Sequence, residues 1–207
     1  MYELGSEGYG VHKNFTVDLR QRFSIFTVTA SYRHGSSNND DSIGGSAGTE
    51  GIGFRIPANS YDRLADWGPS GFLLKRQFSA GINSRLPFDV YVNTAIAANS
   101  GRFYTITTGR DDNSDGVFND RPPGVTKHSE NGPHFFNVSF NVSKAFELGT
   151  SGRAASGPQV NVFANINNAF NLTHLGTPSG VLTSPFFGRS FNAQQPREIE
   201  AGLRFQF

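Results

Sequence analysis

The last eleven residues of the chain, 197–207, read R-E-I-E-A-G-L-R-F-Q-F and change character at every second position. One side of this alternation is apolar: Ile199, Ala201, Leu203, Phe205 and Phe207. The other side is mostly polar or charged. Successive side chains of a β-strand point to opposite faces, so the stretch predicts a strand with one apolar and one polar face. Its length is about that of a tilted strand that crosses a bilayer (~9–11 residues), although an edge strand of a soluble sheet would show the same pattern.

The composition excludes several classes of protein. The 207 residues carry a net charge of +1, so no overall basic field attracts nucleic acid or acidic lipid. The chain has no cysteine, which excludes disulfides, thiolate metal sites and a cysteine nucleophile. No apolar run approaches the ~18–20 residues of a membrane helix. The mean hydropathy of −0.39 still suits strands with one polar face.

The same two-residue period predicts six further strands, near residues 12–20, 23–33, 74–86, 88–98, 134–146 and 159–167. In the fifth of these, Phe136, Val138 and Phe140 alternate with Asn137, Ser139 and Asn141. β-Branched and aromatic residues suit a pleated surface, and no segment keeps a helical period. The sequence therefore predicts an all-β protein.

Short and long connections alternate strictly between the predicted strands. The short ones are residues 21–22, Pro87 and 149–158, and the long ones are 35–71, 99–133 and 170–196. A compact soluble domain seldom carries three such long loops, whereas a transmembrane β-barrel has short periplasmic turns and long outer loops. We therefore predict an antiparallel transmembrane β-barrel segment of about seven to eight strands.

The strand count and the chain start suggest an incomplete barrel. Bacterial single-chain barrels generally have an even number of strands, and the first predicted strand here would enter from outside. Residues 1–10 (MYELGSEGYG) contain no basic and then apolar run, so they are not a secretory signal. We expect residues 1–207 to form the carboxy-terminal portion of a larger barrel, either as a fragment or as a truncated relative.

Seven short segments carry a family resemblance. They are LRQRFS (19–24), ADWGPS (65–70), SGRFYTITTGR (100–110), NDRP (119–122), NINNAFN (165–171), LTSPFFG (182–188) and PR (196–197). In this order they resemble the carboxy-terminal barrel of TonB-dependent receptors, in particular the Oar-like group. The likeness covers nearly the whole chain. It implies the last third or so of a barrel of roughly 22 strands.

The resemblance also implies location, partners and activity. The location is the cell outer membrane of a Gram-negative bacterium, and the partners are membrane lipid and the barrel-assembly machinery. TonB would act only through a plug domain, which has no counterpart in this chain. Outer loops would capture an unknown solute, which then passes a gated lumen, so no enzyme activity and no nucleic-acid binding are implied. The terminal strand is similar to the family's assembly signal, matched here by Glu200, Gly202, Phe205 and Phe207.

The sharpest local motif is DDNSDGVFND at residues 111–120. It matches D-x-[DN]-x-[DN]-G, the opening of a calcium loop, in which alternate oxygens bind the ion. The candidate oxygen ligands are Asp111, Asn113, Asp115, the carbonyl of Val117, and Asp120. The closing Glu of such loops is absent and Pro122 stands in its place. The alternative is an Asx-rich turn without metal. Calcium is the one cofactor candidate.

Outer-loop aromatic residues are candidates for ligand contact, because a ring can stack on a solute. They are Trp67, Phe103, Tyr104, Phe186 and Phe187. Those near strand ends would instead form an interfacial aromatic girdle. The amides of Asn161, Asn165 and Asn167 share one strand face, where they would line a lumen and either contact a solute or only solvate it.

Two classes of function remain open. The first is an outer-membrane barrel segment that serves TonB-dependent uptake. The second is a surface-exposed adhesin or a glycan-binding β module without transport. Stable folding in water would favour the second class, because the first needs lipid or detergent on its apolar face. No substrate signature is readable.

Overall fold

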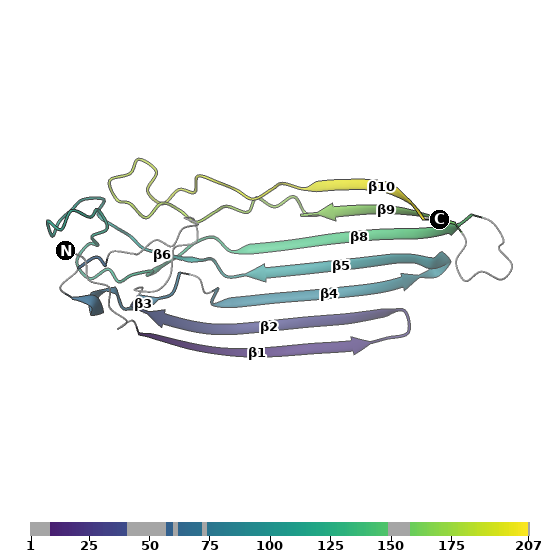
Figure 1. Cartoon of the computed structure of the whole chain (residues 1–207), viewed down its shortest axis with the longest axis horizontal. Coiled ribbons are helices and arrows are strands. Elements are labelled where there is room, and N and C mark those ends of the chain that lie inside the picture. The colour runs from purple at the N-terminus through teal and green to yellow at the C-terminus, as the bar shows by residue number, and fades with distance from the viewer. Residues whose placement is uncertain (1–8, 41–56, 60–61, 72–73, 149–157, 207) are drawn as a thin grey trace.

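The computed structural model describes residues 9–40, 57–59, 62–71, 74–148 and 158–206. Within these ranges, seven long strands form one antiparallel sheet in the order β1-β2-β4-β5-β8-β9-β10 (Figure 1). Their bounds are β1 Gly10–Arg22, β2 Phe26–Asn39, β4 Arg76–Leu86, β5 Val90–Asn99, β8 Phe135–Glu147, β9 Gln159–Asn167 and β10 Glu198–Gln206. Every long strand thus lies beside the long strand that precedes it in the chain.

Smaller elements decorate this sheet. β3 (Gly68–Pro69) extends it by pairing with the end of β2, and β6 (Phe103–Tyr104) pairs with β7 (Glu130–Asn131) in a separate ribbon. Two 3-10 turns, η1 (Arg63–Asp66) and η2 (Pro87–Asp89), are the helical elements of the described residues. Among those residues, no helix is both long and apolar enough to span a membrane.

The seven predicted strands and their antiparallel order are confirmed, but several predicted boundaries are wrong. The first turn does not lie at residues 21–22: β1 continues to Arg22, and the chain turns where the Phe23 N–H donates to Phe26 O at 2.8 Å. β2 also continues past Arg33 to Asn39. Residues 35–39 (GSSNN) contain no apolar side chain, so the apolar alternation stops there although backbone pairing with β1 does not.

The turn predicted at Pro87 is confirmed, whereas the strand predicted to start at Phe88 begins only at Val90. Phe88 and Asp89 have φ values of 63° and 56°, in the left-handed region. An extended strand cannot accommodate that backbone conformation, and tight hairpins require it. The apolar character of Phe88 had suggested a strand residue, but its side chain is 85% exposed.

The register gives the sheet one apolar and one polar face. Residues that pair across an antiparallel ladder share a face. One such row consists of Val17, Tyr32, Phe78, Ala98 and Phe136. Toward the other edge, Val142 pairs with Ala164, and Val162 pairs with Leu203. The predicted alternation therefore continues in phase from β1 to β10. We call the two surfaces the apolar face and the polar face.

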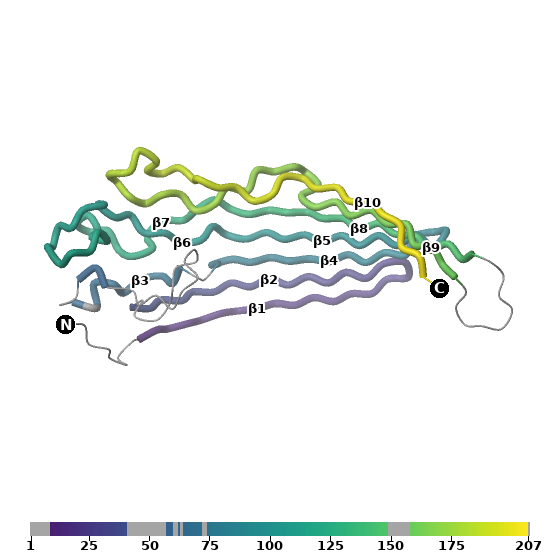
Figure 2. Tube along the Cα trace, turned by 45° about the horizontal axis from the view of Figure 1, so that its top comes forward, coloured from purple at the N-terminus to yellow at the C-terminus, as the bar shows by residue number. Residues whose placement is uncertain are grey.

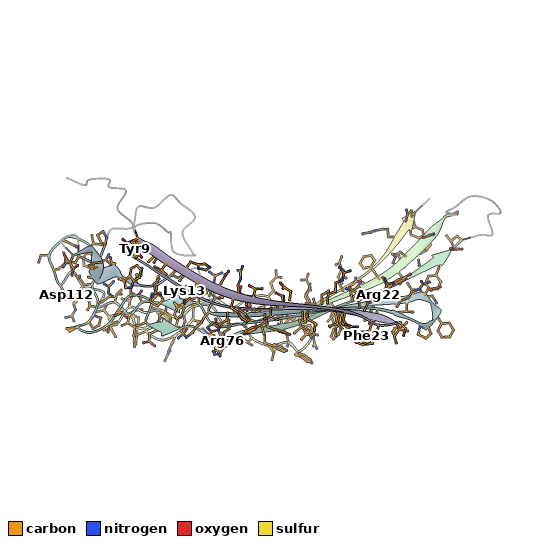
Figure 3. All side chains as sticks on the ribbon, turned by 90° about the horizontal axis from the view of Figure 1, so that it is seen from below. Tyr9, Lys13, Arg22, Phe23, Arg76 and Asp112 are labelled. Atoms are coloured by element: carbon orange, nitrogen blue, oxygen red, sulfur yellow. The ribbon has the colours of Figure 1, made fainter. Side chains whose placement is uncertain are left out.

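The sheet has no hydrophobic core of its own. Seen edge-on, it is a single curved layer with side chains projecting from both sides (Figure 3). Among the described residues only two hydrophobic residues are buried, Ala58 and Val138. The accessible surface of the chain is 14518 Å², whereas a compact monomer of 22.5 kDa exposes about 9,500 Å². Within the described residues β1 and β10 are two separate edges, so the sheet is open and not a closed barrel.

The two ends of the sheet differ. Figure 2 shows the long connections gathered at the end where β1 begins, and the hairpin turns at the other end, where β10 finishes. This separation follows from the alternation of short and long connections. Most of the third short connection, residues 149–157, lies outside the described residues.

Candidate functional site

The long connections form an ordered layer at one end of the sheet. We call residues 57–71 and 100–134, together with 168–197, the loop layer, as far as the structure describes them. Nine of the ten buried residues other than glycine in the described chain lie in it: Ala58, Asp66, Ser70, Ser100, Asp120, Lys127, His128, Asn168 and His174. Eight of these nine are polar or charged, so this layer is held together by hydrogen bonds and ion pairs and not by an apolar core.

A buried ion pair joins the first connection to the second. Arg121 Nη1 lies 2.6 Å from Asp66 Oδ1, with side chains only 11% and 8% exposed. Arg121 also donates from Nη2 to the carbonyl of Ala65 at 2.7 Å, and Asp66 Oδ2 accepts from the Ala58 N–H at 2.9 Å. Buried charges are costly unless they are paired and hydrogen-bonded. This pair meets that requirement with partners 55 residues apart in the chain.

Lys127 ties the second connection to the end of β2, and His128 ties it to β3. The Lys127 ammonium donates to the backbone carbonyl and to the side-chain oxygen of Asn39, both at 2.8 Å. His128 Nδ1 lies 2.6 Å from the Pro69 carbonyl, so this ring nitrogen carries the donating proton. Gly68 allows the backbone of Lys127 to approach β3 closely, because an added Cβ at Gly68 would sit 2.6 Å from the Lys127 carbonyl oxygen.

The third connection packs on the second and on β8. Backbone hydrogen bonds of 2.9 Å run from the Thr107 N–H to Gly180 O and from the Leu182 N–H to Thr107 O. His174 Nε2 lies 2.6 Å from the carbonyl of Phe136, which anchors the connection to β8. The three connections therefore form one hydrogen-bonded network.

The motif at residues 111–120 folds as a self-capped loop. The Asp111 carboxylate accepts from the N–H groups of Asp115 and Gly116 at 3.0 and 2.9 Å. Asp120 Oδ2 accepts from the N–H groups of Asp112 and Asn113 at 2.7 and 3.2 Å. Such side-chain-to-backbone bonds are those of an Asx-rich turn. The described residues contain no group of three or more His, Asp or Glu side chains that could hold a metal ion. Calcium binding stays a prediction.

The calcium prediction can be checked by hydrogen exchange. If the loop binds calcium, the ion should slow exchange of the Asp115 and Gly116 amides in the native chain, because bound ligands are held in place. Asp111→Ala should speed exchange at both amides without calcium, since each loses a hydrogen bond worth about 0.5–1.5 kcal/mol net, and it should abolish the effect of the ion. If calcium does not change the exchange rates of these amides in the native chain, the metal site is contradicted. The loop is then an Asx-rich turn without metal.

The five aromatic residues predicted to contact a ligand lie in different parts of the loop layer. Trp67 stacks on Tyr9 with ring centroids 5.5 Å apart, and Phe186 packs edge-on against Phe191 at 5.3 Å. Phe103 and Tyr104 form β6, and Phe187 is exposed. Their role in ligand contact stays a prediction.

A shallow depression of about 440 Å³ lies elsewhere in the loop layer, between the second and third connections. It is lined by Thr108, Arg110, Asp112, Leu182 and Thr183. Its walls meet closely at Gly109, which has φ 70°, and an added Cβ there would collide with the Thr183 hydroxyl. The sequence did not predict that these residues come together. The glycine after the run of threonines was the one available sign of a close approach.

The apolar face is a broad exposed hydrophobic surface that needs a functional explanation. Its exposed large side chains come from both edges and from the middle of the sheet: Phe15, Val17, Leu19, Tyr32, Phe78, Phe136, Val162, Ile199, Leu203 and Phe205. Soluble monomers rarely expose a contiguous apolar patch beyond ~300–600 Å². A band that crosses seven strands therefore indicates contact with an apolar medium or a large partner.

A row of side-chain hydrogen bonds crosses the polar face. Asn93 Nδ2 donates to Asn141 Oδ1 at 3.2 Å, Asn141 Nδ2 donates to Asn165 Oδ1 at 2.5 Å, and Asn165 Nδ2 donates to Glu200 Oε2 at 3.1 Å. We call these four residues the amide row. The alternation along β9 had predicted that Asn165 shares one strand face with Asn161 and Asn167. Of these three, only Asn165 takes part, because the row runs across strands in register.

The residues similar to an assembly signal take distinct positions in β10. Glu200 ends the amide row, and Phe205 is 57% exposed on the apolar face. Gly202 faces the ring of Phe163, its partner in register: an added Cβ would lie 2.7 Å from Phe163 Cζ. Phe207 lies outside the described residues.

The contact between Gly202 and Phe163 predicts a face-specific effect. Gly202→Val should destabilise the β9–β10 pair by about 1–3 kcal/mol, because the ring must move or the strands must separate. Ala201→Val is the matched control, since Ala201 is exposed on the apolar face and should tolerate the larger side chain. Denaturant unfolding of both variants in detergent checks this. Equal losses would mean that the ring does not pack over the glycine.

No family model, curated protein or solved structure matches the chain. Three geometric features of the chain bear on its function: the apolar face, the polar face and the loop layer. Together they define an amphipathic antiparallel sheet with structured loops at one end.

Proposed function

We propose that this sheet is a section of the wall of an outer-membrane β-barrel. The single observation that carries the proposal is the apolar face, which runs in phase across seven strands, carries exposed large side chains on six of them, and lies opposite a polar face. In water this face would leave many large hydrophobic side chains hydrated at about 25 cal/mol per Å². In a bilayer the same side chains contact acyl chains, and the polar face lines an aqueous lumen.

Strand lengths fit a bilayer. The long strands contain between 9 residues, in β9 and β10, and 14 residues, in β2. A tilted strand needs ~9–11 residues to cross the hydrocarbon core, so each strand suffices. The loop layer would lie outside the cell and the hairpin turns in the periplasm.

The open edges set a further condition. An unpaired strand edge in lipid leaves backbone groups unsatisfied at several kcal/mol each. A barrel that contains this sheet therefore needs strands beyond β1 and β10, supplied by a longer polypeptide or by another chain. The barrel-assembly machinery would place them, guided by the terminal strand.

Within this proposal the protein serves solute uptake as part of a TonB-dependent receptor of the Oar-like group in the outer membrane of a Gram-negative bacterium. The segments that resemble this family support it, and the ordered loop layer suits capture of a solute at the cell surface. The solute would then pass along the polar face. TonB would act through a plug domain.

The alternative is an adhesin or a glycan-binding β module without transport. One observation favours it: the buried polar residues and the depression of about 440 Å³ both lie in the loop layer and not on the polar face. A binding function would then need only this layer.

Partition between water and detergent tests the proposal. The full chain, expressed without detergent, should aggregate or enter membranes, and should become monodisperse in micelles, because the apolar face needs cover. Size-exclusion chromatography and thermal unfolding measure this. A monodisperse monomer in water with a sharp unfolding transition would contradict the membrane proposal and favour the binding module.

A further inference from the structure

We propose that the free edge of β10 binds an antiparallel strand that carries an arginine or a lysine opposite Glu200. The inference rests on the proposed function, because it assigns a chemistry to the strand that continues the barrel wall. It concerns the polar face, whereas the membrane proposal rests on the apolar face. The two can therefore fail separately.

The edge is available for pairing along its whole length. On one side, β10 pairs with β9 from Glu198, opposite Asn167, to Gln206, opposite Gln159. On its other side, no described strand pairs with it. The unpaired edge of a strand presents a row of N–H and C=O groups that can pair with another strand.

The amide row makes Glu200 a distinctive point on that edge. Three hydrogen bonds lead across β5, β8 and β9 to Glu200 Oε2. In the other direction the same register row continues through Asn83 and Thr27. Glu200 is thus the charged end of a row that is otherwise uncharged as far as β2. No hydrogen bond of its Oε1 is present within the described chain.

A joining strand would place a side chain directly opposite Glu200 on the polar face, so the chemistry of that side chain is restricted. A cationic side chain opposite Glu200 could donate to its Oε1 oxygen in a charge-assisted bond, which is stronger than a hydrogen bond from a neutral donor. A carboxylate opposite Glu200 would add repulsion between like charges. Glu198 lies two residues away on the same face and increases the preference for a cation, while Arg204, four residues away, favours an acid opposite itself.

The apolar side of the joining strand is equally defined. It must place apolar residues opposite Ile199, Ala201, Leu203 and Phe205, because these share the apolar face with the rest of the sheet. A register slip of one residue would move every apolar side chain to the polar face. A cation opposite Glu200 therefore also fixes the register of the new pair.

Two synthetic peptides test the inference on the full chain in detergent micelles. Both are matched in length to β10, are apolar opposite its apolar residues and carry threonine at the other positions. They differ only opposite Glu200, where one has arginine and the other glutamate. The arginine peptide should bind about tenfold more tightly in a fluorescence anisotropy titration, which is the size of effect typical of a charge pair at an interface.

A charge reversal and a control distinguish the edge from general electrostatics. Glu200→Arg should reverse the preference, so that the glutamate peptide binds more tightly. Asp18→Asn, which removes a carboxylate on the polar face of the opposite edge strand β1, should leave the preference unchanged. A cross-link from a photoreactive residue in the peptide should map to β10.

Several results would overturn the inference. They are equal affinity for both peptides, binding of neither peptide, a preference that survives Glu200→Arg, and cross-links that map to β1. Self-association of the chain that excludes both peptides would assign the edge to a second copy instead. None of these results changes the partition of the apolar face into detergent, so the proposed function is judged separately.

Discussion

Replacing Val17 with arginine should strongly reduce insertion of the chain into lipid vesicles, while the same replacement at Thr16 should leave insertion intact. Val17 lies near the middle of β1 on the apolar face, in register with Tyr32. Arginine at a lipid-facing position near the bilayer midplane costs about 2–4 kcal/mol. Thr16 directly precedes Val17 and its side chain points to the polar face, where arginine remains in water.

A substitution at Val17 distinguishes a lipid environment from water, because Val17 is not buried in the isolated sheet. Its side chain is 48% exposed, so in a water-soluble protein arginine there would be nearly neutral. Val138 would be a poorer choice, because it is buried and arginine would disrupt packing under either interpretation. Sedimentation with vesicles and protease protection of the two variants give the comparison. Equal insertion of both would contradict the assignment of faces.

Replacing Asp66 with asparagine should loosen the loop layer by about 3–5 kcal/mol, because it leaves the Arg121 guanidinium buried without a counterion. The pair is 2.6 Å apart with both side chains nearly buried. Loss of the charge should detach the first connection from the second, while the strands keep their pairing. Hydrogen exchange should therefore rise in residues 57–71 and 107–130 and stay low in the sheet.

An exposed pair of the same length is the matched control. Arg85 and Asp89 are also 2.6 Å apart, but their side chains are 65% and 66% exposed. Asp89→Asn should leave stability nearly unchanged, because water screens a surface ion pair. Asparagine also tolerates the left-handed backbone at this position. If both variants had the same small effect, the Asp66–Arg121 pair would not be what orders the loops.

The sheet was predictable because its signal is local. A two-residue alternation is written in each strand, and the in-phase apolar row from Val17 to Phe136 follows once neighbouring strands pair. The ends of strands were less predictable. Phe88 is apolar and still lies in a turn, and β2 continues through a polar segment, because backbone pairing does not require apolar side chains.

The loop layer and the amide row were not predictable from one sequence, because they depend on contacts between distant residues. Asp66 and Arg121 are 55 residues apart, and no local pattern relates them. Asn141 and Asn165 meet only because β8 and β9 pair in one particular register. The calcium motif illustrates the opposite case: the local pattern was clear, and the fold uses its carboxylates to cap the backbone.

Lipid accessibility along β1 shows whether the apolar face of the sheet meets a membrane. Spin labels placed singly at residues 12–20 of the full chain in lipid vesicles would report collision with oxygen, which concentrates in lipid, and with a water-soluble nickel complex. We expect lipid contact at Phe15, Val17 and Leu19 and water contact at Thr16 and Asp18. Water contact at all five positions, without alternation, would show that the apolar face does not meet a membrane and would rule out the proposed place of the sheet in a barrel wall.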